Sequence, residues 1–208
     1  NEILSGLVGS EMCIRDSPSI FVANEFFDAL AIKQFQKKGS LWFEKFVILN
    51  KEKSFFSEKK INMVYGGGDK GLMGHAARSM INKGVKVTGI VPKFLMKYID
   101  RNIGFHRLIE TKDMHERKLT MYSLSDIFLV LPGGIGTLDE MTEVLTWNQL
   151  GIHSKKVIIG NFEEFWTPYI DLLIHLNKFK YLSDLSRINY SIASNASDIL
   201  RLIEAPDH

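Results

Sequence analysis

The sequence predicts an α/β fold, a single domain in three layers built around a doubly wound parallel sheet. Three observations carry this prediction. Segments with strand character and segments with helix character alternate from Ile61 onward, with short connections between them. Two of the strand segments lead directly into glycine-rich turns and then into helices. The chain has 208 residues, of which 45% are hydrophobic and 24% charged, so it can bury one sizeable core.

The expected strands are short apolar runs closed by glycine, proline or polar residues, at 61–65, 86–91, 106–110, 126–131, 156–160 and 188–192. The expected helices fill the intervals: one that ends near residue 83, and then 94–98, 114–124, 137–150, 163–178 and 196–204. Asp113 and Glu116 form a capping box for the helix that starts at Met114. Gly151 is a suitable stop for the helix before it.

The first 60 residues are less regular. Ser19–Ala23 is the candidate for the first strand, and Asn24–Lys38 is the candidate for the helix after it. Phe46–Leu49 is a rival for the first strand, but it leaves few residues for a crossover helix before Ile61.

Composition and charge exclude several classes of function. The net charge is +2 and no stripe of lysine and arginine is present, so we expect no nucleic-acid partner. No apolar run approaches the length of a membrane span, so we expect no membrane association and a cytoplasmic protein. Cys13 is the only cysteine, and the six histidines show no ligand-like spacing. We therefore expect neither a disulfide framework nor a metal site.

The most informative segment combines a strand, a glycine-rich turn and a helix. Asp126–Leu131 is almost wholly apolar, as expected for a strand that is covered on both faces. Pro132 ends the strand, and three glycines within the next four residues allow a ligand to approach the backbone. The following amides belong to a helix N-terminus, which favours an anion such as a phosphate. We expect Asp139 and Glu140 in the first turn of this helix, where its dipole would hold Glu140 ionised.

A second glycine-rich turn, Gly66–Gly74, follows the strand at 61–65. Alone it is weak evidence, because any tight turn between a strand and a helix favours glycine. Two such turns at the carboxyl ends of strands are typical of the ligand site of an open α/β sheet. With carboxylates beside one of them, they indicate chemistry on a phosphorylated sugar or a nucleotide.

Four motifs occur together: Gly66–Gly68 with Gly71–Gly74, Met114–Lys118, Pro132–Glu140 and Thr146–His153. With these motifs in order and at similar spacing, the chain from about residue 61 to residue 160 resembles the LONELY GUY (LOG) family. The members are cytokinin riboside 5′-monophosphate phosphoribohydrolases, long mislabelled as lysine decarboxylases. The resemblance implies a Rossmann-like fold, usually dimeric. It also implies hydrolysis of the N-glycosidic bond of N6-substituted AMP, which yields the free base and ribose 5-phosphate.

By this resemblance, Arg117 and Glu140 match the catalytic arginine and glutamate of the family. A carboxylate can stabilise the cation-like ribosyl centre of such a cleavage and can orient or deprotonate water. A guanidinium keeps its proton and can fix a carboxylate, a phosphate or a base. The candidate substrate- and phosphate-binding residues are Gly67, Gly68, Met114, Lys118, Gly133, Gly134, Gly136, Thr137 and Glu143. The expected partners are a nucleotide monophosphate and a second copy of the chain in a homodimer, and no cofactor is expected.

Each of these roles has a structural alternative. Glu140 could be only an acid that favours a helix start. Arg117 could pair with Glu116 or Asp113 on the helix surface, and Lys118 could be solvated. Trp147 could be a packing or interface residue.

Two other functions stay open on the sequence. A broader nucleosidase would accept ordinary purine or pyrimidine monophosphates. A non-catalytic nucleotide or cofactor carrier could use the same fold, since a fold does not fix a function. Lysine decarboxylation is disfavoured, because neither Lys70 nor Lys118 has the context of a lysine that binds pyridoxal phosphate.

The N-terminal region departs from the family pattern. A first strand that ends in a Cys-Gly-Ser-type loop is usual in the family, whereas Phe21–Glu25 contains no glycine. The segment Gly6–Ser17 resembles a translated adaptor sequence. We therefore expect residues 1–17 to be a leader that is not native to the protein, ahead of a single catalytic domain at 18–208. The departure concerns the base side of the nucleotide pocket, and we expect the phosphate and ribose side to be intact.

Overall fold

The computed structural model describes residues 19–23, 35–38, 41–44, 61–182 and 188–205, and it describes side chains in the last two of these ranges. The predicted leader at 1–17, residues 24–34 of the predicted first helix and the rival strand at 46–49 lie outside the described residues. Both glycine-rich turns and the helices that follow them lie within 61–182.

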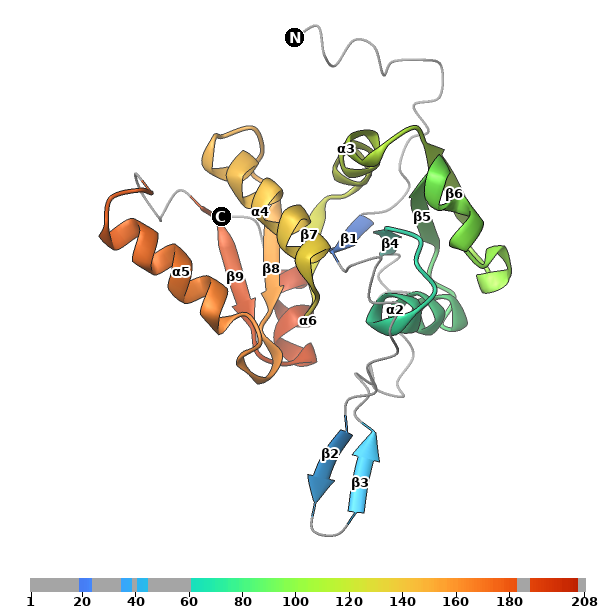
Figure 1. The fold of residues 1–208 in the computed structure, drawn as a ribbon, viewed down its shortest axis with the longest axis horizontal. Helices are drawn as coiled ribbons and strands as arrows, with labels where there is room; N and C mark the ends of the chain where they lie inside the picture. The colour runs from blue at the N-terminus through green and yellow to red at the C-terminus, as the bar shows by residue number, and fades with distance from the viewer. Residues whose placement is uncertain (1–18, 24–34, 39–40, 45–60, 183–187, 206–208) are drawn as a thin grey trace, which may run out of the picture.

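The core of the fold is a seven-stranded parallel sheet in the order β6-β5-β4-β1-β7-β8-β9 (Figure 1). The strands are β1 (Ser19–Ala23), β4 (Asn62–Tyr65), β5 (Val87–Pro92), β6 (Arg107–Thr111), β7 (Ile127–Val130), β8 (Lys156–Gly160) and β9 (Tyr190–Ala193). The strand β1 pairs with β4 on one side and with β7 on the other, both in parallel. The predicted parallel sheet is therefore confirmed, with the predicted first strand at its centre.

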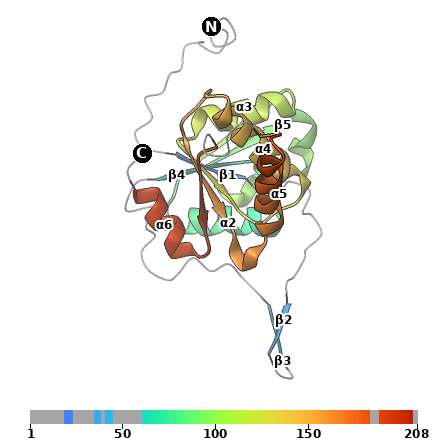
Figure 2. The same cartoon turned by 90° about the vertical axis from the view of Figure 1, so that its left-hand side faces the viewer.

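Helices cover both faces of the sheet and complete the three predicted layers. They are α2 (Gly71–Asn82), α3 (Met114–Leu124), α4 (Ile135–Gln149), α5 (Thr167–Lys178) and α6 (Ala196–Glu204), with short 3-10 turns η2 (Lys93–Tyr98), η3 (Arg101–Ile103) and η4 (Phe162–Glu164). Figure 2 shows α2 and α6 on one face and α3 and α4 on the other. No described helix is both long enough and apolar enough to cross a membrane.

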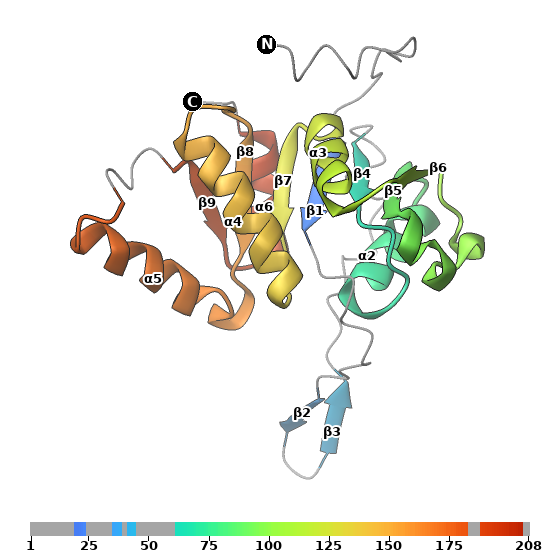
Figure 3. The same ribbon diagram turned by 45° about the horizontal axis from the view of Figure 1, so that its top comes forward.

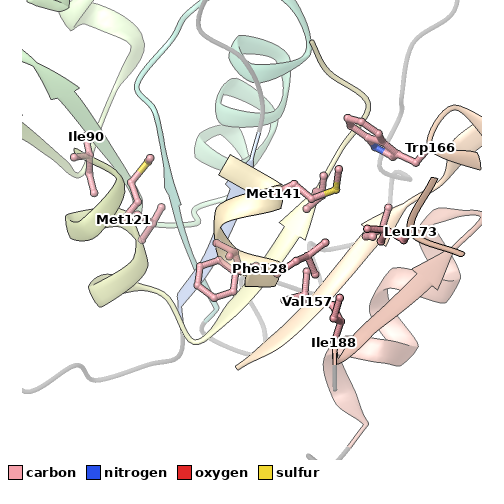
Figure 4. Packing of buried hydrophobic residues seen from close by; sticks show 13 residues of the cluster. Ile90, Met121, Phe128, Met141, Val157, Trp166, Leu173 and Ile188 are labelled. Carbon is pink, nitrogen blue, oxygen red and sulfur yellow. The ribbon is translucent and has the colours of Figure 1, made fainter. Parts of the chain in front are cut away.

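Two hydrophobic cores lie on the two faces of the sheet. Under α2 and α6, Met73 and Ile199 pack in the same cluster as Leu129 of β7. On the other face, Met121 of α3 and Met141 of α4 pack in the same cluster as Phe128 of β7 (Figure 4). Alternate residues of β7 thus enter opposite cores, as the apolar run in the sequence predicted.

The helix predicted over 163–178 is shorter than expected. Glu163 and Glu164 have positive φ angles of 51° and 62°, so the chain leaves the right-handed helical region within η4, before α5 begins. Pro168 then stands in the first turn of α5, where the missing N–H of proline costs no helical hydrogen bond. The proline is the sequence signal for the later start.

The helix predicted over 24–38 is wrong at its end, because Phe35–Lys38 forms the strand β2. It pairs in antiparallel register with β3 (Leu41–Glu44), and Lys38 lies opposite Leu41. Figure 1 shows this hairpin apart from the main sheet. The sequence carries the signal for it, since a Gly-Ser dipeptide separates the two strands and aromatic residues favour strand structure. The helical spacing of phenylalanine and leucine upstream outweighed that signal in the prediction.

Candidate active site

The candidate site lies at the carboxyl ends of β4 and β7, which flank the central strand β1. The strand order reverses at β1, since β4, β5 and β6 lie on one side and β7, β8 and β9 on the other. Open α/β sheets form their ligand crevice at such a reversal. Both predicted glycine-rich turns leave the sheet at this place.

The first glycine-rich turn makes room for an arginine. A Cβ atom at Gly66 would collide with Nη2 of Arg117, so only glycine lets the guanidinium lie against the backbone after β4. Gly67 has a φ of +78°, and a Cβ atom there would collide with Val91 of β5. Gly68 is buried directly after them. The turn therefore brings α3 and β5 close to the backbone that follows β4.

The second glycine-rich turn leads into α4. Gly134 is the N-cap residue, and Gly136 and Thr137 lie in the first turn. A Cβ atom at Gly133 would collide with Oγ1 of Thr137, so the threonine lies against this turn. Thr137 is fully buried, and its hydroxyl has no hydrogen-bond partner among the described residues. A buried hydroxyl without a partner at a helix N-terminus suits a ligand rich in acceptor oxygens, such as a phosphate.

The two acidic residues lie deeper in α4 than predicted. The helix begins at Ile135, and its first turn contains no acidic residue. The prediction that Asp139 and Glu140 lie in the first turn is therefore wrong. Because a helix dipole acts mainly over the first turn, it cannot fix the ionisation state of Glu140.

Arg117 of α3 and Glu140 of α4 form a buried ion pair, which we call the inner pair. Figure 3 shows the two helices side by side over the sheet. Nη1 of Arg117 donates to Oε1 of Glu140 at 3.0 Å, and the two side chains are 3% and 6% exposed. Nε of Arg117 donates to the carbonyl oxygen of Ile90 in β5 at 3.3 Å. The alternative that Arg117 is a surface residue paired with Glu116 or Asp113 is therefore wrong.

Burial dominates the acidity of Glu140. It raises the pKa of Glu140 to about 7, and the charge and hydrogen bond of Arg117 lower that pKa only in part. This corrects the expectation that the helix dipole holds the carboxyl ionised. Oε2 of Glu140 has no hydrogen-bond partner among the described residues. A carboxyl with a pKa near neutrality and an unpaired oxygen is suited to general acid–base work.

Next to the inner pair, Lys118 of α3 forms ion pairs with Asp139 and Glu143 of α4. We call these three residues together the outer pair. Nζ of Lys118 lies 3.0 Å from Oδ2 of Asp139 and 3.1 Å from Oε2 of Glu143. The side chain of Lys118 is 12% exposed, whereas those of Asp139 and Glu143 are 59% and 27% exposed. Burial lowers the pKa of Lys118, but its hydrogen bonds to the two carboxylates outweigh burial and leave the pKa raised. Lys118 is therefore a paired cation rather than a solvated one.

A small hollow, open to solvent, lies between α3 and α4 beside Glu140. Its lining residues are Lys118, Met121, Tyr122, Phe128, Glu140, Glu143, Val144 and Trp147. Trp147, predicted only as a packing or interface residue, is edge-on to Tyr122 with ring centroids 5.0 Å apart. The lining comes from three consecutive elements, α3, β7 and α4, and only their packing against one another forms the hollow.

The end of α4 is held by side-chain hydrogen bonds. Asn148 is buried, accepts the N–H of Asn189 at 2.6 Å and donates to the carbonyl of His153 at 3.2 Å. Nε2 of His153 lies 2.9 Å from the carbonyl oxygen of Val144, and its Nδ1 accepts the N–H of Lys155 at 3.0 Å. These contacts require a neutral imidazole with its proton on Nε2, and burial lowers the pKa of His153. The predicted motif at the end of α4 thus supports the helix that carries Glu140.

The start of α3 brings one further predicted residue close to the site. Met114 packs against the small cluster that contains Val91, the neighbour of the first glycine-rich turn. Oδ1 of Asp113 accepts the N–H of Glu116 at 2.8 Å, as the predicted capping box requires. The glutamate carboxylate accepts the N–H of Lys112 at 2.7 Å, one residue before the cap.

For three residues, the contribution to the site was not predicted from the sequence. Gly66 lay inside a predicted motif, but the need for space beside Arg117 is visible only in three dimensions. Ile90 acts through its backbone carbonyl, which no side-chain pattern can reveal. Asp139 was expected beside the second glycine-rich turn, but its ion pair with Lys118 was not predicted.

The titratable groups at the site pair with one another. Within the described ranges, no group of three or more histidine, cysteine or acidic side chains could hold a metal ion. Glu140 contacts Arg117, and both outer carboxylates contact Lys118. The groups that the site offers for chemistry are a buried carboxyl and two cations.

Comparison with known proteins identifies the family to which the chain belongs. A family model described as "Possible lysine decarboxylase" matches residues 73–203. A second model, whose description names an S-adenosyl-L-methionine-dependent methyltransferase, matches residues 9–83. The cytokinin riboside 5′-monophosphate phosphoribohydrolase LOG7 of Arabidopsis thaliana is 38% identical over 150 residues, which cover 71% of this chain and 68% of the relative. The cytokinin riboside 5′-monophosphate phosphoribohydrolase of Rhodococcoides fascians is 32% identical over 151 residues, which cover 72% and 76%.

Solved structures share the fold at low identity. The molybdenum cofactor binding protein of Rippkaea orientalis aligns with a TM-score of 0.56 and 21% identity, over 91% of this chain and 97% of that one. The molybdenum cofactor carrier protein of Chlamydomonas reinhardtii aligns with a TM-score of 0.55 and 14% identity, over 90% and 96%. These two likenesses concern the fold alone and confirm the predicted α/β class. By its family model and its relatives, the chain belongs to the LOG family, whose model carries the description "Possible lysine decarboxylase" and whose relatives named above are cytokinin riboside 5′-monophosphate phosphoribohydrolases.

Proposed function

We propose that the protein hydrolyses the N-glycosidic bond of N6-substituted adenosine 5′-monophosphates and releases the free base and ribose 5-phosphate. The observation that carries the proposal is the inner pair, whose Glu140 keeps an oxygen unpaired among the described residues. The names of two relatives, at 32% and 38% identity, support the same substrate class.

In this proposal, the 5′-phosphate binds at the N-terminus of α4. Gly134, Gly136 and Thr137 offer backbone N–H groups and one buried hydroxyl there. The small size of Gly133 and Gly134 lets the phosphate approach the backbone. A phosphate held at the start of α4 leaves the ribose pointing along the helix toward Glu140, one turn further on.

The reaction breaks the bond between C1′ of the ribose and the base nitrogen, whose electron pair leaves with the base. As the bond breaks, C1′ becomes cation-like, and the ionised carboxylate of Glu140 stabilises that charge. Water adds to C1′ and gives a proton to the carboxylate of Glu140. The departing base takes up one proton from solvent, and Glu140 returns its proton to solvent, so that the carboxylate is ionised again. Arg117 holds one carboxylate oxygen at 3.0 Å and leaves the other toward the substrate.

The test is product analysis with N6-isopentenyl-AMP. The wild-type protein should release ribose 5-phosphate, and Glu140→Gln should lower the rate by at least about 10²-fold, the usual cost of losing an acid–base group. Lys86→Met, which changes an exposed residue outside the site, is the matched control and should keep the wild-type rate. Near-normal hydrolysis by Glu140→Gln would show that the proposed role is wrong.

The same assay separates the two other functions that the sequence left open. A broader nucleosidase would release ribose 5-phosphate from plain AMP as fast as from N6-isopentenyl-AMP. A non-catalytic carrier would bind the nucleotide, as calorimetry would show, and release no ribose 5-phosphate. The proposal expects release that is faster with the N6-substituted nucleotide.

We also propose that the protein is a cytoplasmic homodimer. Exposed apolar side chains on α5 and directly after it support self-association: Leu172, Ile174, Phe179 and Tyr181. Sedimentation velocity should give the mass of a dimer, and Leu172→Glu with Ile174→Glu should shift it to the monomer. Phe94→Glu, an exposed site on η2, is the control and should leave the dimer intact. A monomeric wild type, or a fluorescent fusion outside the cytoplasm, would contradict this proposal.

A further inference from the structure

The outer pair adjoins the inner pair residue by residue. Lys118 follows Arg117 on α3, and Asp139 precedes Glu140 on α4. Lys118 contacts Asp139 at 3.0 Å and Glu143 at 3.1 Å, so one cation contacts residues one turn apart on the facing helix. The two helices are thus joined by two parallel ion pairs, one buried and one at the mouth of the hollow.

The outer pair also adds charge close to the buried carboxyl. Lys118 and Glu140 line the same hollow, and the ammonium favours the ionised form of the carboxyl. The carboxylate of Asp139 has the opposite effect, because like charges disfavour each other. The pairing with two carboxylates in turn keeps Lys118 protonated, since it outweighs the cost of burying the ammonium.

Few other titratable groups face Glu140. Arg117, Lys118 and Tyr122 face it from α3, and Asp139 and Glu143 stand on its own helix. Among the described residues of the sheet, Ile90 and Phe128 lie at this place, and neither titrates. The set of charges that acts on the carboxyl is therefore small enough to change one member at a time.

We propose that Lys118 is a positioning residue for the hydrolysis: it holds α3 against α4 through Asp139 and Glu143, and it supplies a positive charge that favours the ionised Glu140. In this role, Lys118 acts through Glu140. For its kinetic part, this inference rests on the proposed function. Its electrostatic part concerns the protein alone and can be measured without a substrate.

The test compares two variants that change the charge around Glu140 in opposite directions. Lys118→Met removes the cation and leaves the carboxylate of Asp139 in place, so the titration of Glu140 should move to higher pH. Asp139→Asn removes an anion, and Lys118 keeps its contact with Glu143, so the titration should move to lower pH. The titration is followed by 13C NMR of the carboxyl carbon in the full chain, with Glu140→Gln to assign the signal.

The kinetic readout is the pH profile of kcat for ribose 5-phosphate release. Lys118→Met should lose about tenfold in kcat at pH 6 and less than about threefold at pH 9, because only the ionised carboxyl is active. Lys118→Arg keeps the charge and should restore the wild-type profile. Lys86→Met changes the net charge by the same amount at an exposed site and should also keep it.

A purely structural role for Lys118 predicts a different pattern. Lys118→Met and Asp139→Asn would then both lower kcat at every pH and leave the carboxyl titration where it is in the wild type. That result, or movement of the titration in one direction for both variants, would overturn the inference. If the wild type releases no ribose 5-phosphate, the proposed function fails, and the NMR titration alone decides whether Lys118 sets the charge of Glu140.

Discussion

The inner and the outer pair join the same two helices, yet they stand in different surroundings. The inner pair has side chains that are 3% and 6% exposed, and one of its carboxylate oxygens has no partner within the described ranges. The outer pair has one cation for two carboxylates, and Asp139 is 59% exposed. Water can solvate the outer carboxylates, whereas the inner one depends on a single guanidinium.

This difference shows what separates a reactive carboxyl from a supporting one. Burial raises the pKa of Glu140 to about 7, while the neighbouring Asp139 lies at the surface. The two residues have the same chemistry and adjoin in sequence, but the helix turns them toward different surroundings. A carboxyl that is kept partly unsatisfied lowers the stability of the fold and gains reactivity toward a substrate.

The largest effect on hydrolysis and stability is expected when Arg117, the cation of the inner pair, is removed. Arg117→Met leaves Glu140 without its partner, so the pKa of the carboxyl should rise and the carboxyl should be protonated at pH 7. We expect hydrolysis to fall by about 10³-fold. We also expect the free energy of unfolding to fall by about 3 kcal/mol at pH 8, the usual cost of breaking a buried ion pair. Arg78→Met, at an exposed arginine of α2, should change neither quantity by a comparable amount. Equal effects of the two variants would show that the inner pair contributes no more to hydrolysis or stability than an exposed arginine does.

The pH dependence of stability tests the burial of Glu140 directly. The pKa of Glu140 is about 7 in the folded protein, against an ordinary value of 4.5. Between these values the folded state keeps a proton that the unfolded state has lost, so this group lowers stability as the pH rises through that window. The full difference is about 3 kcal/mol. Glu140→Gln loses the ion pair with Arg117 but cannot ionise, so the stability of the wild type relative to this variant should fall by up to that amount between pH 5 and pH 8. Urea unfolding at both pH values measures it, and parallel curves for the two proteins would refute the raised pKa.

A third variant fills the space beside Gly66 that holds the guanidinium of Arg117. In Gly66→Ala the new Cβ atom collides with Nη2 of Arg117, so the guanidinium must move away from Glu140. We expect a loss of about 1–3 kcal/mol in the free energy of unfolding, together with a fall in hydrolysis. Gly151→Ala is the matched control, because its Cβ atom meets nothing within 4 Å and only its φ of +71° is strained. The control should lose some stability and keep its activity per folded molecule. Full activity of Gly66→Ala would show that the position of the guanidinium is unimportant.

The smallest effect is expected at the outer pair. Asp139 is largely exposed, and Lys118 keeps Glu143 as a partner when the aspartate is changed. Asp139→Asn should therefore cost less than about 1 kcal/mol in the free energy of unfolding, as is usual for surface ion pairs. Thermal unfolding at low and high salt measures this contribution. A loss as large as that of Arg117→Met would show that the outer pair is as important to the fold as the inner one.

Local sequence patterns predicted the frame of the site well. The bounds of β1, α3, β8 and α6 are those expected from apolar runs and caps, and the two glycine-rich turns lie at one edge of the sheet as expected. These features depend on neighbours along the chain. The same reasoning paired Asp113 with the third residue of α3, which the capping hydrogen bond confirms.

The errors concern properties that depend on the rest of the fold. The start of α4 shifted toward Ile135, which moved Glu140 out of the first turn and replaced the helix dipole with burial as the main influence on its acidity. The partners of Lys118 lie on another helix, more than 20 residues away in sequence. The strand at Phe35 was read as a helix because apolar spacing was weighed above the Gly-Ser turn signal.

The most direct test of the account is a crystal structure of Glu140→Gln with bound AMP, since this variant should bind the nucleotide and not cleave it. The account predicts the 5′-phosphate on the backbone of Gly134 and Gly136 and C1′ of the ribose within about 3.5 Å of the side chain at position 140, the distance of a reacting pair. A nucleotide whose phosphate lies elsewhere, or whose C1′ faces away from that side chain, would contradict it.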